Sequence, residues 1–370
     1  MLNNLKLSAI TVLGAGEAGL EFIKKTREKN SGIKLTLIDK NAHYFDKSKF
    51  IRSMDLKAYV DLKDFAQKHN VMFIQDTVER INPKQKKIYF KQNEPIDFEV
   101  LVVASGVKSK SIPLKGERRE GLFYLSDINP FEFKSLLKIS SELIIYVTTF
   151  LGLELCVLLK SAGKEVRVLG DNWNFLASYK ERVVNFLSEK QINVHLNVTV
   201  DEVIGEGQVK ATKISPLNPP SLASSLPATG EASARFPLAQ NEKQEPIGIS
   251  SKSFKVFSSQ MVFLDTGFSP NLDFFEAPIN ITNIFTEFEN IFVVGDCGRM
   301  DIGNDYFYAY NSDEARSQAQ LLSQFILEAK EASFVRKILS EEDKQKMIDD
   351  FIAAKENINS ENQNLNKTVN

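Results

Sequence analysis

The stretch Ala9-Ile10-Thr11-Val12-Leu13-Gly14-Ala15-Gly16-Glu17-Ala18-Gly19 decides the fold of this chain. Its first five residues form an apolar run that predicts a buried strand, and the pattern Gly-x-Gly-x-x-Gly follows at once. A helix is predicted from Gly16 to about Lys29, and a second strand over residues 34–39. Residues 8–39 therefore have the order strand, glycine turn, helix and strand, which is typical of a nucleotide-binding α/β unit.

Each glycine of this pattern has a mechanical role. Gly14 permits a tight turn, Gly16 lets the backbone approach a pyrophosphate, and Gly19 lets the helix pack closely on the strand. The pyrophosphate would lie at the helix N-terminus, where unpaired N–H groups and the helix dipole favour negative charge. The residues predicted to bind it are Gly14, Ala15, Gly16, Glu17, Ala18 and Gly19.

An acidic residue stands where the ribose of such a ligand would need an acceptor. Asp39 comes 20 residues after Gly19, at the end of the second strand, and Lys40 follows it. Strand, helix and acid together predict a dinucleotide site rather than a bare strand–helix turn without a ligand. They do not distinguish FAD from NAD.

Length and composition indicate a globular protein of two domains. The chain has 370 residues, of which 43% are apolar and 25% charged, and its formal net charge is −2. This charge gives no reason to expect a nucleic-acid partner, and no apolar run is long enough to predict a transmembrane segment. The first residues lead into a strand and do not fit a signal peptide.

The cysteines and histidines have no spacing that is typical of a metal site. Cys156 and Cys297 lie far apart and form no Cys-x-x-Cys motif, and His43, His69 and His195 show no ligand spacing. We therefore predict no metal site and two structural thiols. Isolated thiols fit a reducing compartment, so the cytoplasm is the expected location.

The following residues continue the alternation of strands and helices. Residues 71–107 predict a β-meander, and residues 143–169 predict a second strand–turn–helix–strand unit whose helix starts near Gly152. Strands are expected over 193–203 and 208–214. The pattern is that of a second α/β unit that follows the first.

Residues 215–250 break this pattern. They are rich in Pro, Ser and Ala, and we interpret them as a disordered low-complexity insertion between two strands. Strands over 254–266 and 291–294 and a helix over 313–329 are predicted after it. A charged helix is then expected from Ser340, followed by an Asn-rich tail.

Three further motifs follow the glycine turn in a fixed order. Val100-Leu101-Val102-Val103-Ala104-Ser105-Gly106 and Leu264-Asp265-Thr266-Gly267-Phe268-Ser269-Pro270-Asn271 are strands that end near a glycine, and Ile291-Phe292-Val293-Val294-Gly295-Asp296 is a strand that ends in Gly-Asp. With the first turn, they resemble the pyridine nucleotide-disulfide oxidoreductase superfamily of flavoproteins. More narrowly, the chain is similar to members without a redox disulfide, such as type II NADH dehydrogenases, apoptosis-inducing-factor-like proteins and rubredoxin or ferredoxin reductases.

The resemblance implies an α/β fold with two Rossmann-like, three-layer ββα domains, the second inserted in the first. It implies an FAD-binding domain of residues 1–112 and 265–335 and an NAD(P)H-binding-like domain of residues 113–264. Residues 336–370 would form a C-terminal helix and a disordered tail.

The resemblance also implies FAD as the ligand of the first turn. In the family, the aspartate at the position of Asp296 binds the ribityl chain, and a carboxylate accepts strongly from hydroxyl donors. Val78 would offer its backbone to the adenine, and residues 43–50 would lie beside the isoalloxazine ring. The strand ends would add Ala104, Ser105, Gly106, Gly267 and Gly295 to the site.

The second unit departs from the family's pattern. Val147-Thr148-Thr149-Phe150-Leu151-Gly152-Leu153-Glu154 aligns with G-x-G-x-x-G-x-E, but only Gly152 and Glu154 match it. Val147 and Thr149 replace the first two glycines, and a side chain there disfavours the turn and the close approach of a phosphate. Gly170 stands where the ribose-binding acid is expected, although Asp171 follows it.

Two interpretations of this unit stay open. In the first, it binds NAD(P)H with a shifted pyrophosphate, to which the Thr148 or Thr149 hydroxyl donates, and Gly152 and Glu154 keep their roles. In the second, the pyridine nucleotide site is lost. As candidate catalytic residues we name Glu154, near the nicotinamide, and Lys47 or Lys49, which would pair with it near the flavin. The alternatives are a helix-capping acid and solvated lysines.

The function that the resemblance implies is hydride transfer from NAD(P)H to flavin N5. Electrons would then pass to an acceptor that the sequence does not choose, namely a quinone, a small redox protein or oxygen. No redox-active disulfide is expected, because disulfide reduction requires an exchanging dithiol pair. The alternative function is a flavoprotein with a degenerate NAD(P)H site that acts as an electron-transfer or scaffold subunit.

The C-terminal region carries two short apolar stripes, one within residues 334–339 and one within residues 347–352. Their flanking charges are mixed, without the basic face of a helix that binds a membrane surface. We therefore favour a docked helix or a partner contact over peripheral membrane contact.

Overall fold

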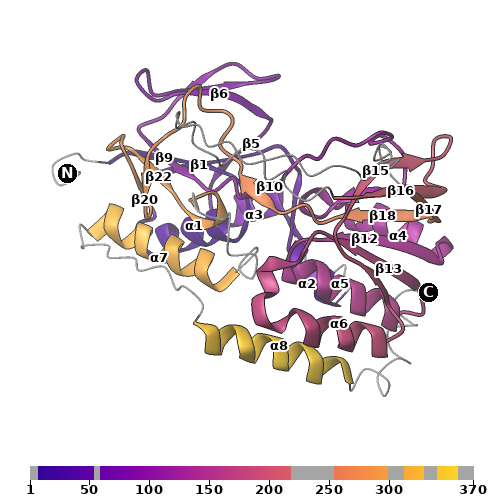
Figure 1. Cartoon of the computed structure of the whole chain (residues 1–370). Coiled ribbons are helices and arrows are strands. Elements are labelled where there is room, and N and C mark those ends of the chain that lie inside the picture. The colour runs from indigo at the N-terminus through magenta and orange to yellow at the C-terminus, as the bar shows by residue number, and fades with distance from the viewer. Residues whose placement is uncertain (1–6, 54–58, 218–253, 299–311, 329–339, 357–370) are drawn as a thin grey trace, which may run out of the picture.

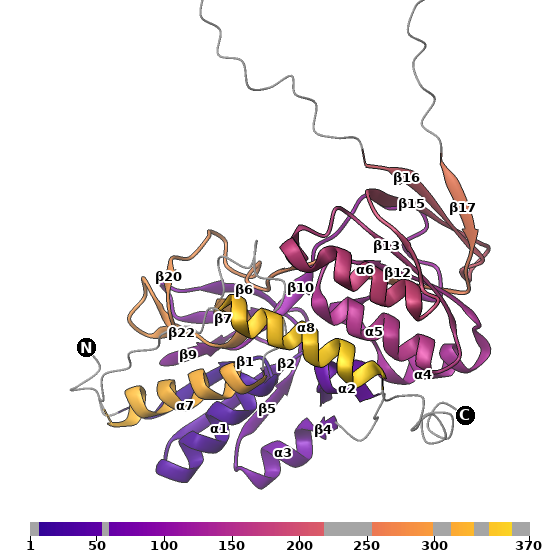
Figure 2. The same cartoon turned by 60° about the horizontal axis from the view of Figure 1, so that its bottom comes forward.

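The structure is a computed structural model that describes residues 7–53, 59–217, 254–298, 312–328 and 340–356. The described residues form two parallel sheets with their own helices. Figures 1 and 2 show the first sheet with helices α1 and α7 on one side of the molecule, and the second sheet with α4, α5 and α6 on the other. In the described part of the chain, none of the helices combines the length and the hydrophobicity that a membrane crossing requires.

Seven strands form the first sheet, in the order β20-β21-β22-β9-β1-β2-β5. Strands β22, β9, β1, β2 and β5 run parallel, and β20 and β21 extend the sheet antiparallel. The strand bounds are β1 Ala9–Leu13, β2 Lys34–Asp39, β5 Met72–Gln75, β9 Val100–Val103, β20 Ile281–Thr282, β21 Phe285–Thr286 and β22 Ile291–Val293. The glycine turn lies at the carboxyl end of the central strand β1.

The first sheet is covered on both faces. Helices α1 (Glu17–Lys29) and α7 (Ser312–Glu328) lie side by side on one face, where Phe22 and Leu322 share a core with Val12. The meander β6 (Val78–Asn82), β7 (Lys87–Phe90) and β8 (Ile96–Asp97) covers the other face. Three layers result, because the strands are apolar on both sides.

The second sheet has the strand order β11-β18-β12-β13-β14, and all its pairs are parallel. Its bounds are β11 Leu122–Tyr124, β12 Glu142–Val147, β13 Glu165–Gly170, β14 Asn193–His195 and β18 Met261–Leu264. Helices α4 (Pro130–Ile139), α5 (Phe150–Ser161) and α6 (Lys180–Glu189) belong to one large core with this sheet. The antiparallel strands β15 (Val198–Ile204), β16 (Ala211–Pro216) and β17 (Lys255–Ser258) contribute to the core on the other face.

Two short strands mark where the chain passes between the sheets. β10 (Val107–Ser109) leaves the first sheet, β19 (Phe268–Pro270) returns to it, and the two pair antiparallel. All strands of the second sheet lie between them in sequence. The predicted fold class, two Rossmann-like three-layer units with the second inserted in the first, is confirmed.

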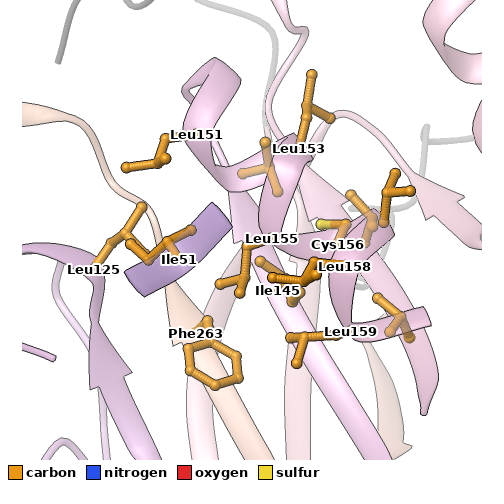
Figure 3. Packing of buried hydrophobic residues seen from close by; sticks show 14 of the residues in the cluster. Ile51, Leu125, Ile145, Leu151, Leu153, Leu155, Cys156, Leu158, Leu159 and Phe263 are labelled. Atoms are coloured by element: carbon orange, nitrogen blue, oxygen red, sulfur yellow. The ribbon is translucent and has the colours of Figure 1, made fainter. Parts of the chain in front are cut away.

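The remaining elements bridge the two units. β3 (His43–Phe45) pairs with β4 (Tyr59–Asp61), and α3 (Leu62–Lys68) follows β4. Helix α2 (Lys47–Ser53) comes from the first unit, yet its Ile51 is buried in the core of the second, where Figure 3 shows it with Leu125, Leu151 and Leu155. The first and second units are therefore joined by apolar packing as well as by the two crossing strands.

Helix α8 (Glu341–Glu356) docks on the second unit beside α6 (Figure 1). Its residues Ile348 and Phe351 are buried, and the Phe351 ring contacts Phe150 and Phe186 with centroids 5.2 and 5.4 Å apart. Arg182 and Asp349 form an ion pair at 2.5 Å. A docked helix was the favoured interpretation of the stripe at 347–352; residues 329–339 and 357–370 lie outside the described residues.

Several predicted element bounds need correction. The strand expected over 193–203 is two strands, β14 and β15, because Asn197 between them has a φ of 58°. The strand expected over 254–266 is likewise β17 and β18. β5, placed in the meander by its sequence, belongs to the parallel sheet. β16 continues to Pro216, into the predicted insertion, and residues 218–250 lie outside the described residues.

Candidate functional site

The first glycine turn has two glycines that the packing requires and one that it does not. Gly14 has a φ of 104°, and a Cβ there would lie 2.3 Å from the Ala104 carbonyl oxygen. A Cβ on Gly19 would lie 2.0 Å from the Gly14 oxygen. Gly16 has a φ of −78°, which any residue adopts, and no heavy atom lies within 4 Å of the place of its Cβ. The free space over Gly16 is at the N-terminus of α1, where a pyrophosphate would lie.

Asp39 lies against this turn. Its two carboxylate oxygens accept from the Ala15 and Asn41 backbone nitrogens, each at 2.8 Å. A carboxylate has further lone pairs, so Asp39 can still accept from ribose hydroxyls. Lys40, next to it, is exposed, and Val78 packs on the core that contains Leu13.

The Gly-Asp strand end reaches the same turn. Gly295 has a φ of 75°, and a Cβ there would lie 3.2 Å from the Ala18 Cβ. Its backbone nitrogen donates to the buried Gln318 side chain at 2.6 Å. Asp296 follows in the short 3₁₀ helix Gly295–Gly298, half-buried. The structure thus brings the first glycine turn and the predicted ribityl-binding aspartate to one edge of the first sheet.

A polar cluster that the sequence did not indicate flanks the start of α1. The Glu17 carboxylate accepts from the Tyr44 hydroxyl at 3.0 Å and from the Arg316 guanidinium at 2.7 Å. Burial and the neighbouring Glu17 carboxylate raise the pKa of Tyr44 well above its usual range. Arg316 also pairs with Asp313 at 2.7 Å. The Glu17 carboxylate is therefore positioned by two side chains, and its charge is paired with that of Arg316.

The two crossings between the sheets hold each other. The Ser105 hydroxyl donates to the Asn271 carbonyl at 2.6 Å, and the Asn271 nitrogen donates to the Gly106 carbonyl at 2.9 Å. Gly106 and Gly267 both have a positive φ, of 67° and 77°. No heavy atom lies within 4 Å of a Cβ placed on Gly106.

The three predicted catalytic residues lie on two helices, Lys47 and Lys49 on α2 and Glu154 on α5. The Lys47 amine donates to the Ser126 carbonyl. Burial lowers the pKa of Lys47. Lys49 is exposed on α2, and Glu154 is half-buried on α5. Through this bond Lys47 joins the first unit to the 3₁₀ turn Leu125–Asp127.

The second turn is bound by an acid from within the chain. The Asp265 carboxylate accepts from the backbone nitrogens of Thr148 and Thr149 at 3.2 and 2.8 Å and from the Thr149 hydroxyl at 2.8 Å. The Thr148 hydroxyl donates to the Asp265 carbonyl at 2.8 Å. A phosphate was expected to accept from one of these hydroxyls, whereas in the structure both donate to Asp265.

Asp265 is itself buried, with 1% of its surface exposed. Burial raises its pKa to about 6, and the hydrogen bonds from Thr149 and Thr148 oppose that rise. Its second carboxylate oxygen has no hydrogen-bond partner among the described residues. A Cβ on Gly152 would lie 2.4 Å from the Asp265 carboxylate, so this glycine makes room for the acid.

An indole covers the end of the neighbouring strand β13. Trp173 is fully buried, and its ring nitrogen donates to the Val147 carbonyl at 2.9 Å. A Cβ on Gly170 would lie 2.2 Å from that nitrogen. Gly170 is therefore a glycine because the indole packs against it.

The cysteines and the other titratable groups form no further site in the described residues. Cys156 and Cys297 are free, buried and in different core clusters, and burial raises the pKa of both thiols. The described residues contain no cluster of His, Cys, Asp or Glu that suits a metal ion. A surface hollow near Ile139 and Gln260 lies beside the start of β12, at the opposite end of that strand from the second turn.

The sequence missed four residues that shape these sites, which are Asp265, Trp173, Arg316 and Gln318. One of them had a visible signal. Ala104 and Asp265 stand at corresponding points of the two strand ends, Ala-Ser-Gly and Asp-Thr-Gly. A charged residue in place of a small one indicated that the second strand end differs from the first.

Comparisons with known proteins agree with this architecture. The family model for pyridine nucleotide-disulphide oxidoreductase matches residues 8–311. Human apoptosis-inducing factor 3 is 22% identical over 214 residues, which are 54% of this chain and 35% of that protein. The nitric oxide reductase FlRd-NAD(+) reductase of Vibrio vulnificus is 22% identical over 219 residues, which are 55% of this chain and 56% of that protein. The chain thus spans about a third and about half of the lengths of these relatives.

The fold is shared with solved reductases. The ferredoxin reductase for the CYP199A2 system from Rhodopseudomonas palustris superposes with a TM-score of 0.65 at 16% identity, covering 88% of this chain and 77% of that one. At 16% identity, this likeness shows the fold alone. Because the family model covers most of the chain, the protein belongs to the pyridine nucleotide-disulphide oxidoreductase family of enzymes.

Proposed function

We propose that the chain is an FAD-dependent oxidoreductase whose cofactor lies over the first glycine turn. The observation that carries the proposal is the free space at Gly16 in a turn whose other glycines are packed. The fold alone does not require a glycine there, whereas a pyrophosphate that approaches the backbone does. The FAD-binding part would comprise residues 1–112 and 265–335, with residues 113–264 as the second unit.

The residues at this edge of the sheet suit the parts of FAD. The amides at the start of α1 would bind the pyrophosphate, Asp39 the ribose and the Val78 backbone the adenine. Asp296 would accept from the ribityl hydroxyls. When bound, FAD would supply the ring that takes up and gives off electrons, while the protein positions it and sets its surroundings.

We further propose that Lys47 acts as a positioning residue near the ring. Its amine is fixed to the Ser126 carbonyl, and Ser126 in turn bonds to Ser109 at the crossing strand β10. This places a cation, whose pKa burial lowers, where the two units meet. Glu154 and Lys49 stay candidates on the adjacent helices.

The electron donor implied by the family is NAD(P)H, and the acceptor would be a quinone, a small redox protein or oxygen. The names of the Vibrio and Rhodopseudomonas relatives, which are reductases of redox systems, favour a redox protein. A mechanism without a redox disulfide is supported by Cys156 and Cys297, because each is buried in a separate core and disulfide exchange needs two neighbouring, accessible thiols. Free thiols also suit the cytoplasm as the proposed location.

One observation favours a second candidate function, a flavoprotein that acts as an electron-transfer or scaffold subunit. The second turn is bound by the Asp265 carboxylate, which leaves its threonine hydroxyls engaged. In this function FAD still binds the first turn, and a partner exchanges electrons with it.

The flavin proposal is tested by the spectrum of the purified protein and by one glycine. Wild-type protein should carry or take up FAD with a stoichiometry of about one. Gly16→Val should abolish uptake and lower the melting temperature of the FAD-free protein by only a few degrees, because the Cβ enters free space and valine is a poorer N-cap than glycine. Gly32→Val is the control, since a Cβ there meets only Asn30 Oδ1, at the contact distance of 3.5 Å, and Gly32 lies in the loop after α1. Colourless wild-type protein, or FAD uptake by Gly16→Val equal to wild type, would contradict the proposal.

A further inference from the structure

We infer that the second nucleotide turn is closed by the chain's own Asp265 carboxylate, which takes the place of a dinucleotide phosphate, so that this turn binds neither NADH nor NADPH. The inference concerns the second unit alone and does not depend on whether FAD binds the first. It selects between the two interpretations that the sequence left open.

The correspondence between the two turns follows from the strand register. The Ala104 nitrogen donates to the Leu13 carbonyl at 2.7 Å, and the Asp265 nitrogen donates to the Tyr146 carbonyl at 2.8 Å. Residues that follow these carbonyls therefore correspond. Gly14 matches Val147, Gly16 matches Thr149 and Asp39 matches Gly170.

Three donors of the turn are already used. A dinucleotide binds at such a turn through backbone N–H groups at the start of the helix. Just before α5, the Thr148 and Thr149 N–H groups donate to Asp265, and the hydroxyl of Thr149, the N-cap residue, donates to it as well. A carboxylate and a phosphate are both anions, so an incoming phosphate would lose these donors and be repelled at short range in a buried setting.

The space that a phosphate would need at the second turn is also filled by side chains of the chain. Thr149 is fully buried, whereas the matching Gly16 borders free space. Gly152 is the one glycine that remains of the motif, and a Cβ there would come within 2.4 Å of the Asp265 carboxylate. Its presence is thus explained by the internal acid, without a ligand.

The adenosine side of the turn is closed by a different residue. In the first unit, Asp39 stands at the end of β2. In the second unit, the Trp173 indole packs against the matching Gly170 and donates to the Val147 carbonyl. A ribose at this strand end would meet the indole, and the next residue, Asp171, already accepts from the Trp173 backbone nitrogen at 2.8 Å. Phe351 of α8 adds apolar cover on Phe150, the first residue of α5.

The chain contains a natural reporter for the test, because Trp173 is its single tryptophan. We would titrate the full-length protein, with whatever flavin it carries, with NADH and with NADPH up to about 1 mM, the upper end of usual substrate affinities. The wavelength of the Trp173 emission maximum reports on the turn, because it responds to contacts at the indole that packs on Gly170, and equilibrium dialysis measures total binding. We expect no saturable change in Trp173 emission with either nucleotide.

Binding by dialysis with a matching saturable change in Trp173 emission would overturn the inference. Binding by dialysis without that change would locate the nucleotide elsewhere and support the closed turn. Failure of the flavin proposal appears separately, as colourless protein in every sample. The two failures are therefore distinguishable.

A variant designed to reopen the turn tests whether nucleotide binding can be gained. Asp265→Ala, combined with Val147→Gly and Thr149→Gly, recreates the pattern of the first turn and should raise the affinity for NADH or NADPH at least tenfold. If melting curves show that this triple variant does not fold, Asp265→Ala alone should bind inorganic pyrophosphate about tenfold more tightly than wild type. Asp265→Asn is the control, since it keeps the size of the side chain and should leave nucleotide binding undetectable. Equal affinity of wild type and a folded Asp265→Ala variant for pyrophosphate would contradict the inference.

Discussion

Ala104 and Asp265 occupy corresponding places in the two parallel sheets, each donating its backbone nitrogen to the strand that precedes a nucleotide turn. The methyl group of Ala104 lies beside the place of a Cβ on Gly19, at 3.4 Å. The carboxylate of Asp265 instead reaches the amides of Thr148 and Thr149. The two turns therefore differ at the position of the second glycine: the Thr149 amide and hydroxyl donate to Asp265, whereas the matching Gly16 borders free space.

The buried acid should make stability depend on pH in a defined direction. The pKa of Asp265 is raised from 3.8 to about 6, so between these values the folded state binds a proton that the unfolded state does not. The contribution of Asp265 to the free energy of unfolding is therefore largest below about pH 4 and falls by about 2–3 kcal/mol as the pH rises through about 6.

Asp265→Asn removes this titration and isolates it from other groups. We would measure the unfolding free energies of wild type and of Asp265→Asn by urea unfolding at several pH values. As the pH rises from about 4 to about 7, the unfolding free energy of wild type should fall relative to that of Asp265→Asn. A difference that stays constant over this range would show that Asp265 has an ordinary pKa.

Charges beside the first turn should tune FAD affinity in opposite directions. Glu17→Gln removes a carboxylate near the pyrophosphate and frees Arg316, so we expect FAD to bind about 2- to 5-fold more tightly. Arg316→Gln leaves that carboxylate without its cation and should weaken binding by a similar factor. Both effects should shrink with added salt.

The measurement is an FAD titration of each variant at low and high ionic strength. Arg80→Gln is the matched control, because Arg80 pairs with Glu276 at 3.0 Å on the meander side of the sheet. If Glu17→Gln and Arg316→Gln changed FAD affinity in the same direction, the pyrophosphate would not lie beside Glu17.

The docked C-terminal helix should contribute to the stability of the second unit. Phe351→Ala removes a ring that is 5% exposed and packs on Phe150 and Phe186, so we expect a loss of about 3–5 kcal/mol in unfolding free energy. Arg182→Ala breaks only the exposed ion pair with Asp349 and should cost about 1 kcal/mol or less. Denaturant unfolding compares the two, and equal losses would show that α8 is held by charge rather than by packing.

The two thiols should be inert in the folded protein. Burial raises the pKa of Cys156 and Cys297, and a thiol reacts as its thiolate. A colorimetric thiol reagent should modify both cysteines in denaturant and neither at a rate above unfolding in buffer. Fast labelling of either thiol in buffer would reopen a redox role for it.

The sequence was sufficient to predict a feature wherever the residues that indicate it lie in one short segment. Gly14, Gly16 and Gly19 lie within six residues, so the whole pattern can be recognised in one short segment between a strand and a helix. The two crossings were recognisable because each is a short apolar strand that ends near a glycine. For this reason the fold class and the family were predicted correctly.

The sequence was insufficient wherever two distant segments meet. Thr149 and Asp265 are 116 residues apart, and their contact depends on strand register, which no single segment determines. Trp173 lies three residues beyond Gly170, but its position over the strand end depends on a left-handed backbone at φ 51°. The partner of Lys47 could not be predicted either, because it is a backbone carbonyl and every residue has one.

Asp265 supplies an anion to the second turn from inside the chain, whereas the first turn borders free space at Gly16, where FAD is proposed to bind. Ligand binding stabilises a folded state by mass action. Under this proposal, added FAD should therefore protect the first unit against local unfolding and leave the second unit unchanged.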